Sequence, residues 1–173
     1  ELGSAEAIWA KTLVERDLGL MQGPFARAHF DSKFGAGRWR PIVRFCVRQA
    51  DDKLRVIDDG RSCGTNQCLS LLEKIHCCCL GTALSAARFL RMLLGSDLVG
   101  KDALLMSVHD MKRAFRQVAV KEDQLCFSVI AVYDPSSHRW TFWQLLALPF
   151  GLKAAVIEFN RVSVNLVALA RRW

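Results

Sequence analysis

The sequence predicts a domain of the α+β class, with an antiparallel sheet that helices cover on one face. Half of the residues are apolar (51%) and a quarter are charged (24%), which is a globular composition. A chain of 173 residues buries about two-thirds of its unfolded surface without needing disulfide bonds. Helical and β-prone segments both occur, but they do not follow the strict strand-helix-strand order of a parallel sheet.

The N-terminal third is expected to form a helix followed by a hairpin. Residues 5–20 place apolar side chains among charges at helical spacing, and Gly23-Pro24 ends this pattern. Residues 43–47 and 54–57 are β-prone runs on either side of Ala50-Asp51-Asp52. Such a pattern is typical of two antiparallel strands joined by a turn.

The middle of the chain is expected to contain a loop, a helix and a buried strand. Residues 60–66 are polar and contain two glycines. Residues 83–94 repeat apolar side chains with a helical period, and Gly95 is placed to end that helix. Residues 104–108 form an apolar run that leads into Asp110, which predicts a buried strand with a carboxylate at its end.

The C-terminal third predicts a second hairpin and a long helix. Residues 125–133 and 139–145 are β-prone, and a four-residue turn at 134–137 separates them. A helix is expected after Pro149-Phe150-Gly151. Its spacing predicts a common inner side for these apolar residues: Val156, Phe159, Val162, Leu166 and Leu169.

The charge balance favours an anionic partner. The chain has 24 Lys and Arg against 17 Asp and Glu, a net charge of +7. Residues 33–61 hold eight of the basic side chains and only four acids. The basic residues alternate mostly with apolar or small ones, which predicts a basic face on a strand pair. An ordinary solvated face is the alternative. These residues are Lys33, Arg38, Arg40, Arg44, Arg48, Lys53, Arg55 and Arg61.

The seven cysteines are expected to be free thiols in a reducing compartment, because their number is odd and no secretory leader pattern opens the sequence. An intracellular location, in the cytoplasm or nucleus, follows from this. His76-Cys77-Cys78-Cys79 together with Cys63 and Cys68 lacks paired C-x2-C knuckles, which disfavours zinc. No apolar run approaches the ~20 residues of a membrane-spanning helix, so no membrane partner is expected.

Asp110 is the first candidate for chemistry. A carboxylate exposed at the end of a strand is the oxygen ligand that magnesium prefers, together with phosphates and waters. The alternative is an N-cap for the short helical turn that follows. The neighbouring His109 points to the opposite face by strand alternation, so no catalytic role is expected for it.

Three stretches together resemble one family. Asp110 is followed five residues later by Phe115 and then by Gln117, and residues 148–153 read Leu-Pro-Phe-Gly-Leu-Lys. Upstream, Arg55 precedes a second arginine, Arg61, and a later asparagine. In this order and spacing, over residues 40–170, the chain resembles the fingers and palm of a reverse transcriptase of the retrotransposon kind.

The resemblance implies a right-hand polymerase fold that is incomplete at the C-terminus. It divides the chain into an N-terminal helical segment (1–34), fingers (35–103) and a partial palm (104–173). It also implies an RNA-directed DNA polymerase, a nucleotidyltransferase that extends a primer 3′-hydroxyl with deoxynucleotides under the direction of a template. The implied partners are an RNA or DNA template with its primer, deoxynucleoside triphosphates, and the remaining palm and thumb of a longer polyprotein.

The family's site residues carry over to individual positions. Asp110, with the Met111 carbonyl, would ligate two Mg²⁺ ions. Phe115 would exclude a 2′-hydroxyl, whereas Arg48 and Arg55 would hold the triphosphate. Phe150 and Gly151 would lie against the nascent base pair. The supporting residues would be Arg61, Gln117 and Lys153.

Structural roles are the alternatives for several of these residues. Phe115 and Phe150 are core aromatics in this interpretation, and Arg61 forms an ion pair with Asp58 or Asp59. The indole rings of Trp39, Trp140 and Trp143 could stack on bases. Packing in the core or on the sheet is the favoured interpretation.

The sequence contains no aromatic-x-Asp-Asp motif, from which the family takes its other carboxylates. Asp58-Asp59 is not a substitute, because it belongs to the fingers segment. We therefore expect the chain to be inactive alone. Two departures from the family pattern concern substrate geometry: no proline follows Lys153 closely, and Gly60 stands where an aromatic is usual. The alternative functions are a non-enzymatic nucleic-acid-binding remnant and an RNA-dependent RNA polymerase palm, which the bulk of Phe115 opposes.

Overall fold

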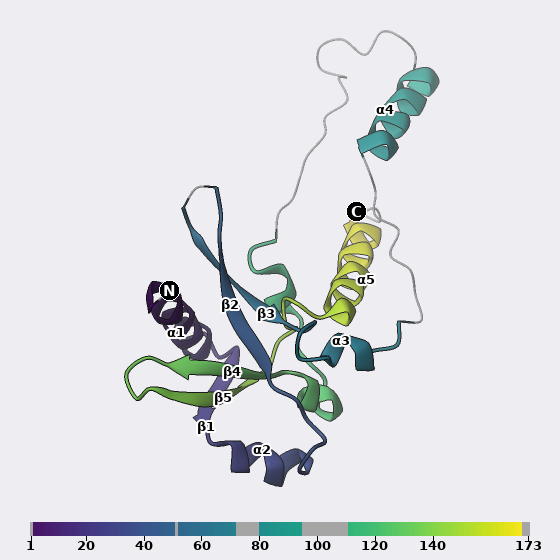
Figure 1. Ribbon diagram of the computed structural model, residues 1–173. Helices are drawn as coiled ribbons and strands as arrows, with labels where there is room; N and C mark the ends of the chain where they lie inside the picture. Colours follow the sequence, from purple (N-terminus) through teal and green to yellow (C-terminus); the bar gives the residue numbers. More distant parts are fainter. Residues whose placement is uncertain (1, 51, 72–79, 95–110, 171–173) are drawn as a thin grey trace. The chain divides into compact units, whose positions relative to one another are not determined.

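The computed structural model describes residues 2–50, 52–71, 80–94 and 111–170 (Figure 1). They fall into two compact units, one made of residues 1–73 and 113–173 and the other of residues 74–112. The second unit contains helix α4 (Leu80–Leu94), which confirms the helix predicted at 83–94. The strand predicted at 104–108 and Asp110 lie outside the described residues.

The first unit is a mixed five-stranded sheet with helices, which confirms the α+β class. The strand order is β1-β5-β4-β2-β3 (Figure 1). Its strands are β1 (Met21–Phe25), β2 (Ile42–Arg48), β3 (Leu54–Asp59), β4 (Val129–Asp134) and β5 (Arg139–Leu145). Its α-helices are α1 (Leu2–Asp17), α2 (Arg27–Phe34), α3 (Thr65–Cys68) and α5 (Lys153–Ala170). The 3-10 turns are η1 (Ala114–Gln117) and η2 (Glu122–Phe127).

Both predicted hairpins are confirmed. In β2 and β3 the partners run from Val43 opposite Asp59 to Arg48 opposite Leu54. In β4 and β5 Asp134 pairs with Arg139 across the turn. The prediction of a purely antiparallel sheet is nevertheless wrong, because β2 and β4 pair in parallel. Turn chemistry predicts pairing within a hairpin, but it does not predict how two hairpins join.

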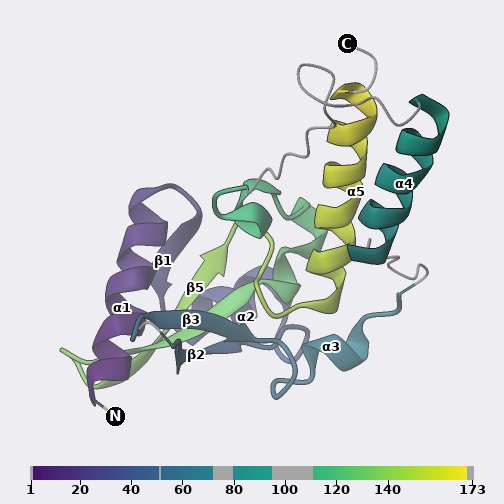
Figure 2. The same cartoon turned by 90° about the horizontal axis from the view of Figure 1, so that it is seen from above.

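The sheet is covered on both faces, which corrects the prediction of one covered face. Ile130 and Val132 of β4 lie in a cluster against which Trp9 of α1 packs, and α1 lies along this face of the sheet (Figure 2). Val129 packs instead with Phe30 of α2. The reason is visible in β4, whose residues 129–132 are all buried. A continuous apolar run, in contrast to an alternating one, is buried on both faces.

The N-terminal helix is confirmed, but strand β1 and helix α2 were not predicted. β1 crosses Gly23-Pro24 and pairs with β5, so the residues expected only to stop a helix form part of an edge strand. Edge strands tolerate proline because one side of the strand makes no ladder hydrogen bonds. The strand predicted at 125–133 begins at Val129, and η2 occupies the residues before it.

The predicted inner side of α5 is wrong for three residues. Val156, Leu166 and Leu169 are 43%, 48% and 55% exposed, whereas Ala155 and Ile157 are buried. Apolar residues occur around most of this helix, so their spacing did not select one face. None of the helices in the described residues is long and apolar enough to cross a membrane.

Candidate functional site

The loop of residues 148–153 docks onto the end of β3 and onto α3. The side chain of Asn66 binds it twice: Nδ2 donates to the Gly151 carbonyl and Oδ1 accepts from the Lys153 amide, each at 2.9 Å. The Phe150 amide donates to the Asp58 carboxylate at 3.1 Å. Two of the three stretches that carry the resemblance are therefore joined by hydrogen bonds.

Glycine is required at 151 by the closeness of this docking. A Cβ atom there would lie 1.7 Å from the Asp58 carbonyl oxygen. A Cβ at Gly60 would likewise lie 2.7 Å from a Leu152 methyl carbon and 2.8 Å from the Gly151 carbonyl oxygen. The packing thus explains why glycine stands at position 60, where an aromatic was expected.

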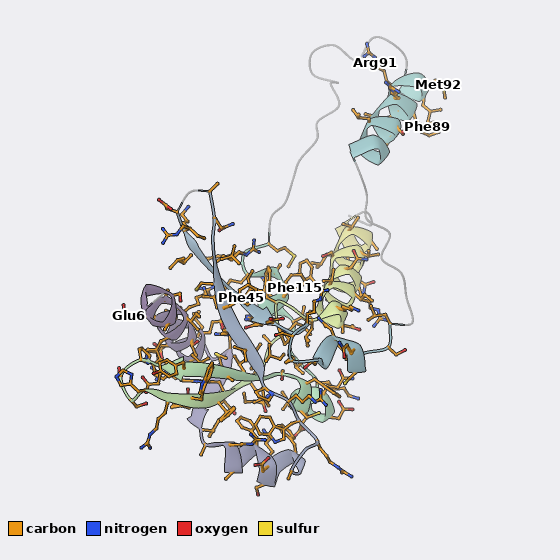
Figure 3. All side chains as sticks on the ribbon, in the orientation of Figure 1. Glu6, Phe45, Phe89, Arg91, Met92 and Phe115 are labelled. Atoms are coloured by element: carbon orange, nitrogen blue, oxygen red, sulfur yellow. The ribbon has the colours of Figure 1, made fainter. Side chains whose placement is uncertain are left out.

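Arg55, Phe115 and Phe150 meet beside this loop. The Arg55 guanidinium lies 4.6 Å from the centroid of the Phe150 ring, within the range of a cation–π contact. The Phe115 ring stands edge-on to Phe150 at 5.1 Å, and its other neighbour is Phe159 at 5.2 Å. Phe115 lies where η1 approaches α5 (Figure 3). The Phe150 ring remains 36% exposed, so the cluster has a side open to solvent.

A buried network of four charged side chains lies next to the cluster of Arg55, Phe115 and Phe150. Arg44 contacts Asp58 at 2.7 Å and Glu15 at 2.6 Å. Arg116 contacts Asp58 at 2.7 Å and Glu15 at 3.2 Å, and it donates to the Leu148 carbonyl at 2.8 Å. All four side chains are at most 10% exposed. The network ties α1, β2, β3 and η1 to the loop.

The charges of this network stabilise one another. Burial by itself would raise the pKa of Asp58, but the Arg44 and Arg116 guanidinium groups and the Phe150 amide lower it, from 3.8 to about 2. Burial opposes the charged form of Arg44, yet Asp58 and Glu15 raise its pKa above the usual value. Both groups are therefore charged at neutral pH.

The structure does not bring Arg48 to the cluster. Val47 pairs with Arg55 in the hairpin, so Arg48, the next residue, belongs to the opposite face. Its guanidinium contacts Asp52 at 3.1 Å, and both side chains are exposed. In this arrangement Arg48 and Arg55 do not lie together to bind one triphosphate.

The remaining residues predicted for the site belong to separate segments of the chain. Arg61 is in the turn after β3, where its amide donates to the Asp59 carboxylate at 3.0 Å. The carboxylate of Asp58 binds arginines other than Arg61. Gln117 ends η1 and is exposed, as is Lys153 at the start of α5. Met111 belongs to the second unit, and Asp110 lies outside the described residues.

The predicted basic face is only partly present. Arg44 is 4% exposed and paired, so it does not belong to a wet face, whereas Arg38, Arg40 and Arg55 are exposed. Trp39 and Trp143 are buried in the two core clusters, which confirms core packing for them. Trp140 is 55% exposed.

The described residues contain no group of three or more His, Cys, Asp or Glu side chains that could hold a metal ion. Cys46, Cys63, Cys68 and Cys126, the cysteines within the described ranges, are free thiols. Within this sequence, the donors that the resemblance implies are Asp110 and the Met111 carbonyl, and the described residues add no group of three acids to them.

Glu15, Arg44 and Arg116 were not predicted as part of the site. One signal for Arg44 was present in the sequence. It follows Ile42 by two positions in a strand, so it shares the face that Ile42 buries. A charged side chain on a buried face requires a partner of opposite charge.

Comparison with known proteins adds no assignment. The chain matches neither a described protein family nor a curated protein of known function.

Proposed function

We propose that this chain forms part of a reverse transcriptase and supplies its surface for the incoming deoxynucleoside triphosphate. The observation that carries the proposal is the meeting of Arg55, Phe115 and Phe150. They come from three separate sequence stretches, and the resemblance implies a nucleotide-binding role for each of them. Their partly exposed cluster combines a cation with aromatic rings, which suits a triphosphate attached to a base and sugar.

Arg55 would bind the triphosphate. Its guanidinium presents several N–H donors in a planar fork, which matches phosphate oxygens. The contact with the Phe150 ring restricts the guanidinium, so less freedom is lost when an anion binds. Arg48 is not required for this step, since its own partner is Asp52.

Phe115 and the loop would shape the site for the sugar and base. The Phe115 ring is fixed between Phe150 and Phe159, and a fixed ring excludes a substituent more effectively than a mobile one. The backbone at Gly151 is held by Asn66 and by close contact with β3. Arg61, Gln117 and Lys153 remain supporting residues in the proposal.

Magnesium enters the proposal as the partner of Asp110 and the Met111 carbonyl that the resemblance implies. When bound, it would stabilise charge on the attacking and leaving oxygens. A template with its primer, and the remainder of a longer polymerase, complete the proposed assembly. The protein residues above bind and orient the nucleotide.

The proposal is tested by photo-crosslinking labelled dATP to the full chain in the presence of magnesium and a recessed primer–template whose next base is thymine. We expect Arg55→Gln to reduce crosslinking about tenfold or more, because it removes a charge-assisted contact. Arg139→Gln, at an exposed arginine on β5, is the matched control and should leave crosslinking unchanged.

Equal losses in both variants would indicate general attraction of anions to a basic protein and would contradict the site. Unchanged crosslinking in Arg55→Gln would remove Arg55 from it. Retained binding of primer–template with no dATP crosslinking in the wild-type chain would favour the nucleic-acid-binding remnant.

A further inference from the structure

A pocket of about 230 Å³ lies where the chain enters β2, away from the contacts described above. Its wall includes Arg38, Trp39 and Arg40 from the segment before the strand, Thr65 from α3, and Cys126 and Phe127 from η2. The wall contains no acidic residue. It therefore combines two positive charges with two aromatic side chains.

Contacts with two glycines position the side chains of the two arginines. The Arg38 side chain packs over Gly35 and Arg40 over Gly64, with nearest atoms 3.2 Å and 3.0 Å from where a Cβ would stand on each glycine. No carboxylate among the described residues forms an ion pair with either arginine. Two guanidinium groups at one pocket attract an anion with several acceptor oxygens, such as a phosphate.

The two aromatic side chains of the wall differ: Trp39 is held in place by its contacts, and Phe127 is exposed. Trp39 donates from Nε1 to Asp31 at 2.9 Å and packs against Phe30 at 5.3 Å, which fixes it in the core. Phe127 is 38% exposed. An exposed aromatic ring beside a cationic group is the arrangement on which nucleic-acid bases stack.

The volume limits the ligand. Pockets that enclose a drug-sized molecule measure roughly 300–1,000 Å³, so this one accommodates a single nucleotide unit at most. We propose that the pocket binds single-stranded nucleic acid through one nucleotide. A backbone phosphate contacts Arg38 and Arg40, and the adjoining base stacks on Phe127.

The pocket is separate from the proposed triphosphate site. Thr65 lines the pocket, whereas its neighbour Asn66 holds Gly151 in the loop. Helix α3 thus contributes to both, but none of the residues assigned to the triphosphate lines the pocket. Strand binding here does not depend on nucleotidyl transfer.

Fluorescence anisotropy of the full chain with a labelled 12-mer of deoxythymidine, at several salt concentrations, tests the pocket. The double variant Arg38→Gln/Arg40→Gln should weaken binding about tenfold. It should also reduce the slope of log affinity against log salt by roughly 0.7 for each phosphate that the protein no longer neutralises. Phe127→Ala should weaken binding about fivefold or more, with an unchanged slope. Arg139→Gln is the matched control for the removal of a surface charge.

The outcomes separate the proposal from its rivals. Wild-type affinity in both the arginine and Phe127 variants would overturn it, and so would the same loss in Arg139→Gln. Displacement of the oligonucleotide by equimolar inorganic phosphate would show a simple anion site and would also overturn it. Melting curves of each variant identify losses that come from unfolding. Oligonucleotide binding is measured here without dATP, and dATP crosslinking is measured separately, so failure of the pocket and failure of the triphosphate site are distinguishable.

Discussion

Asp58 and Arg116 form an ion pair of 2.7 Å although 58 positions separate them in the chain. The same two side chains hold the loop that carries Phe150, since Arg116 donates to the Leu148 carbonyl and Asp58 accepts from the Phe150 amide. The position of the proposed nucleotide surface therefore depends on a buried interaction that does not itself face the ligand.

Asp58→Asn should destabilise the protein by roughly 3–5 kcal/mol, because it leaves two buried arginines with only Glu15 as their carboxylate partner. Urea unfolding at pH 7 measures this. Asp52→Asn makes the same chemical change in the exposed pair with Arg48. It should cost no more than about 1 kcal/mol. Similar values for the two variants would show that the buried network does not stabilise the fold.

Stability should decrease in acid through Asp58. Its pKa is about 2 in the folded chain and 3.8 in its ordinary environment, so the unfolded chain takes up the proton first as the pH falls. The stabilisation is complete above about pH 5 and is lost as the pH approaches 2. The shift corresponds to a contribution on the order of 2 kcal/mol.

Unfolding free energies between pH 7 and pH 3 test this linkage. In the wild-type chain they should fall with pH, and in Asp58→Asn the fall should be smaller, because part of the contribution of this carboxylate is lost by pH 3. The same slope in both proteins would assign the acid sensitivity to other groups.

Gly151→Ala should destabilise the chain by about 3 kcal/mol, because the new methyl group collides with the Asp58 carbonyl oxygen. Gly19→Ala is the control: its φ of +72° disfavours alanine, but nothing lies within 4 Å of the new methyl group. It should cost only about 1–2 kcal/mol. Thermal unfolding compares them, and an equal loss would contradict the close docking at Gly151.

Local sequence patterns predicted the two hairpins, the N-terminal helix and α4, because each depends on residues close in the chain. They did not predict the parallel contact of β2 with β4 or the second covered face. Those depend on pairing between segments far apart. Strand β1 was missed for a related reason, since Gly23-Pro24 is compatible with a strand only at the edge that β5 provides.

The candidate site also contains some residues that the sequence predicted and others that it did not. The family resemblance selected Arg55, Phe115 and Phe150, which the fold brings together. It also grouped Arg48 with Arg55. In the hairpin, however, Arg55 pairs with Val47, so strand alternation places Arg48 and Arg55 on opposite faces. The family pattern specifies neither Glu15 nor Arg116. Their role depends on the fold, which brings α1 and η1 together at Asp58 and Arg44.

Phe115 is predicted to govern the choice of sugar. In competition for labelled dATP crosslinking, ATP should compete poorly with the wild-type chain and better with Phe115→Val, because the smaller side chain leaves room for a 2′-hydroxyl. Phe34→Val removes a ring from the other core cluster, where Phe34 stacks on Phe30, and is the matched control. It should lower stability without changing the ratio. A ratio unchanged in Phe115→Val would make Phe115 a core aromatic only.

The sharpest test of the proposed polymerase site is whether the template selects the nucleotide that the chain binds. The four deoxynucleoside triphosphates are each competed against labelled dATP, with primer–templates that differ only in the templating base. The account predicts that the complementary nucleotide competes best on every template and that this preference is lost in Arg55→Gln. Equal competition by all four nucleotides, whatever the template, would contradict a polymerase site.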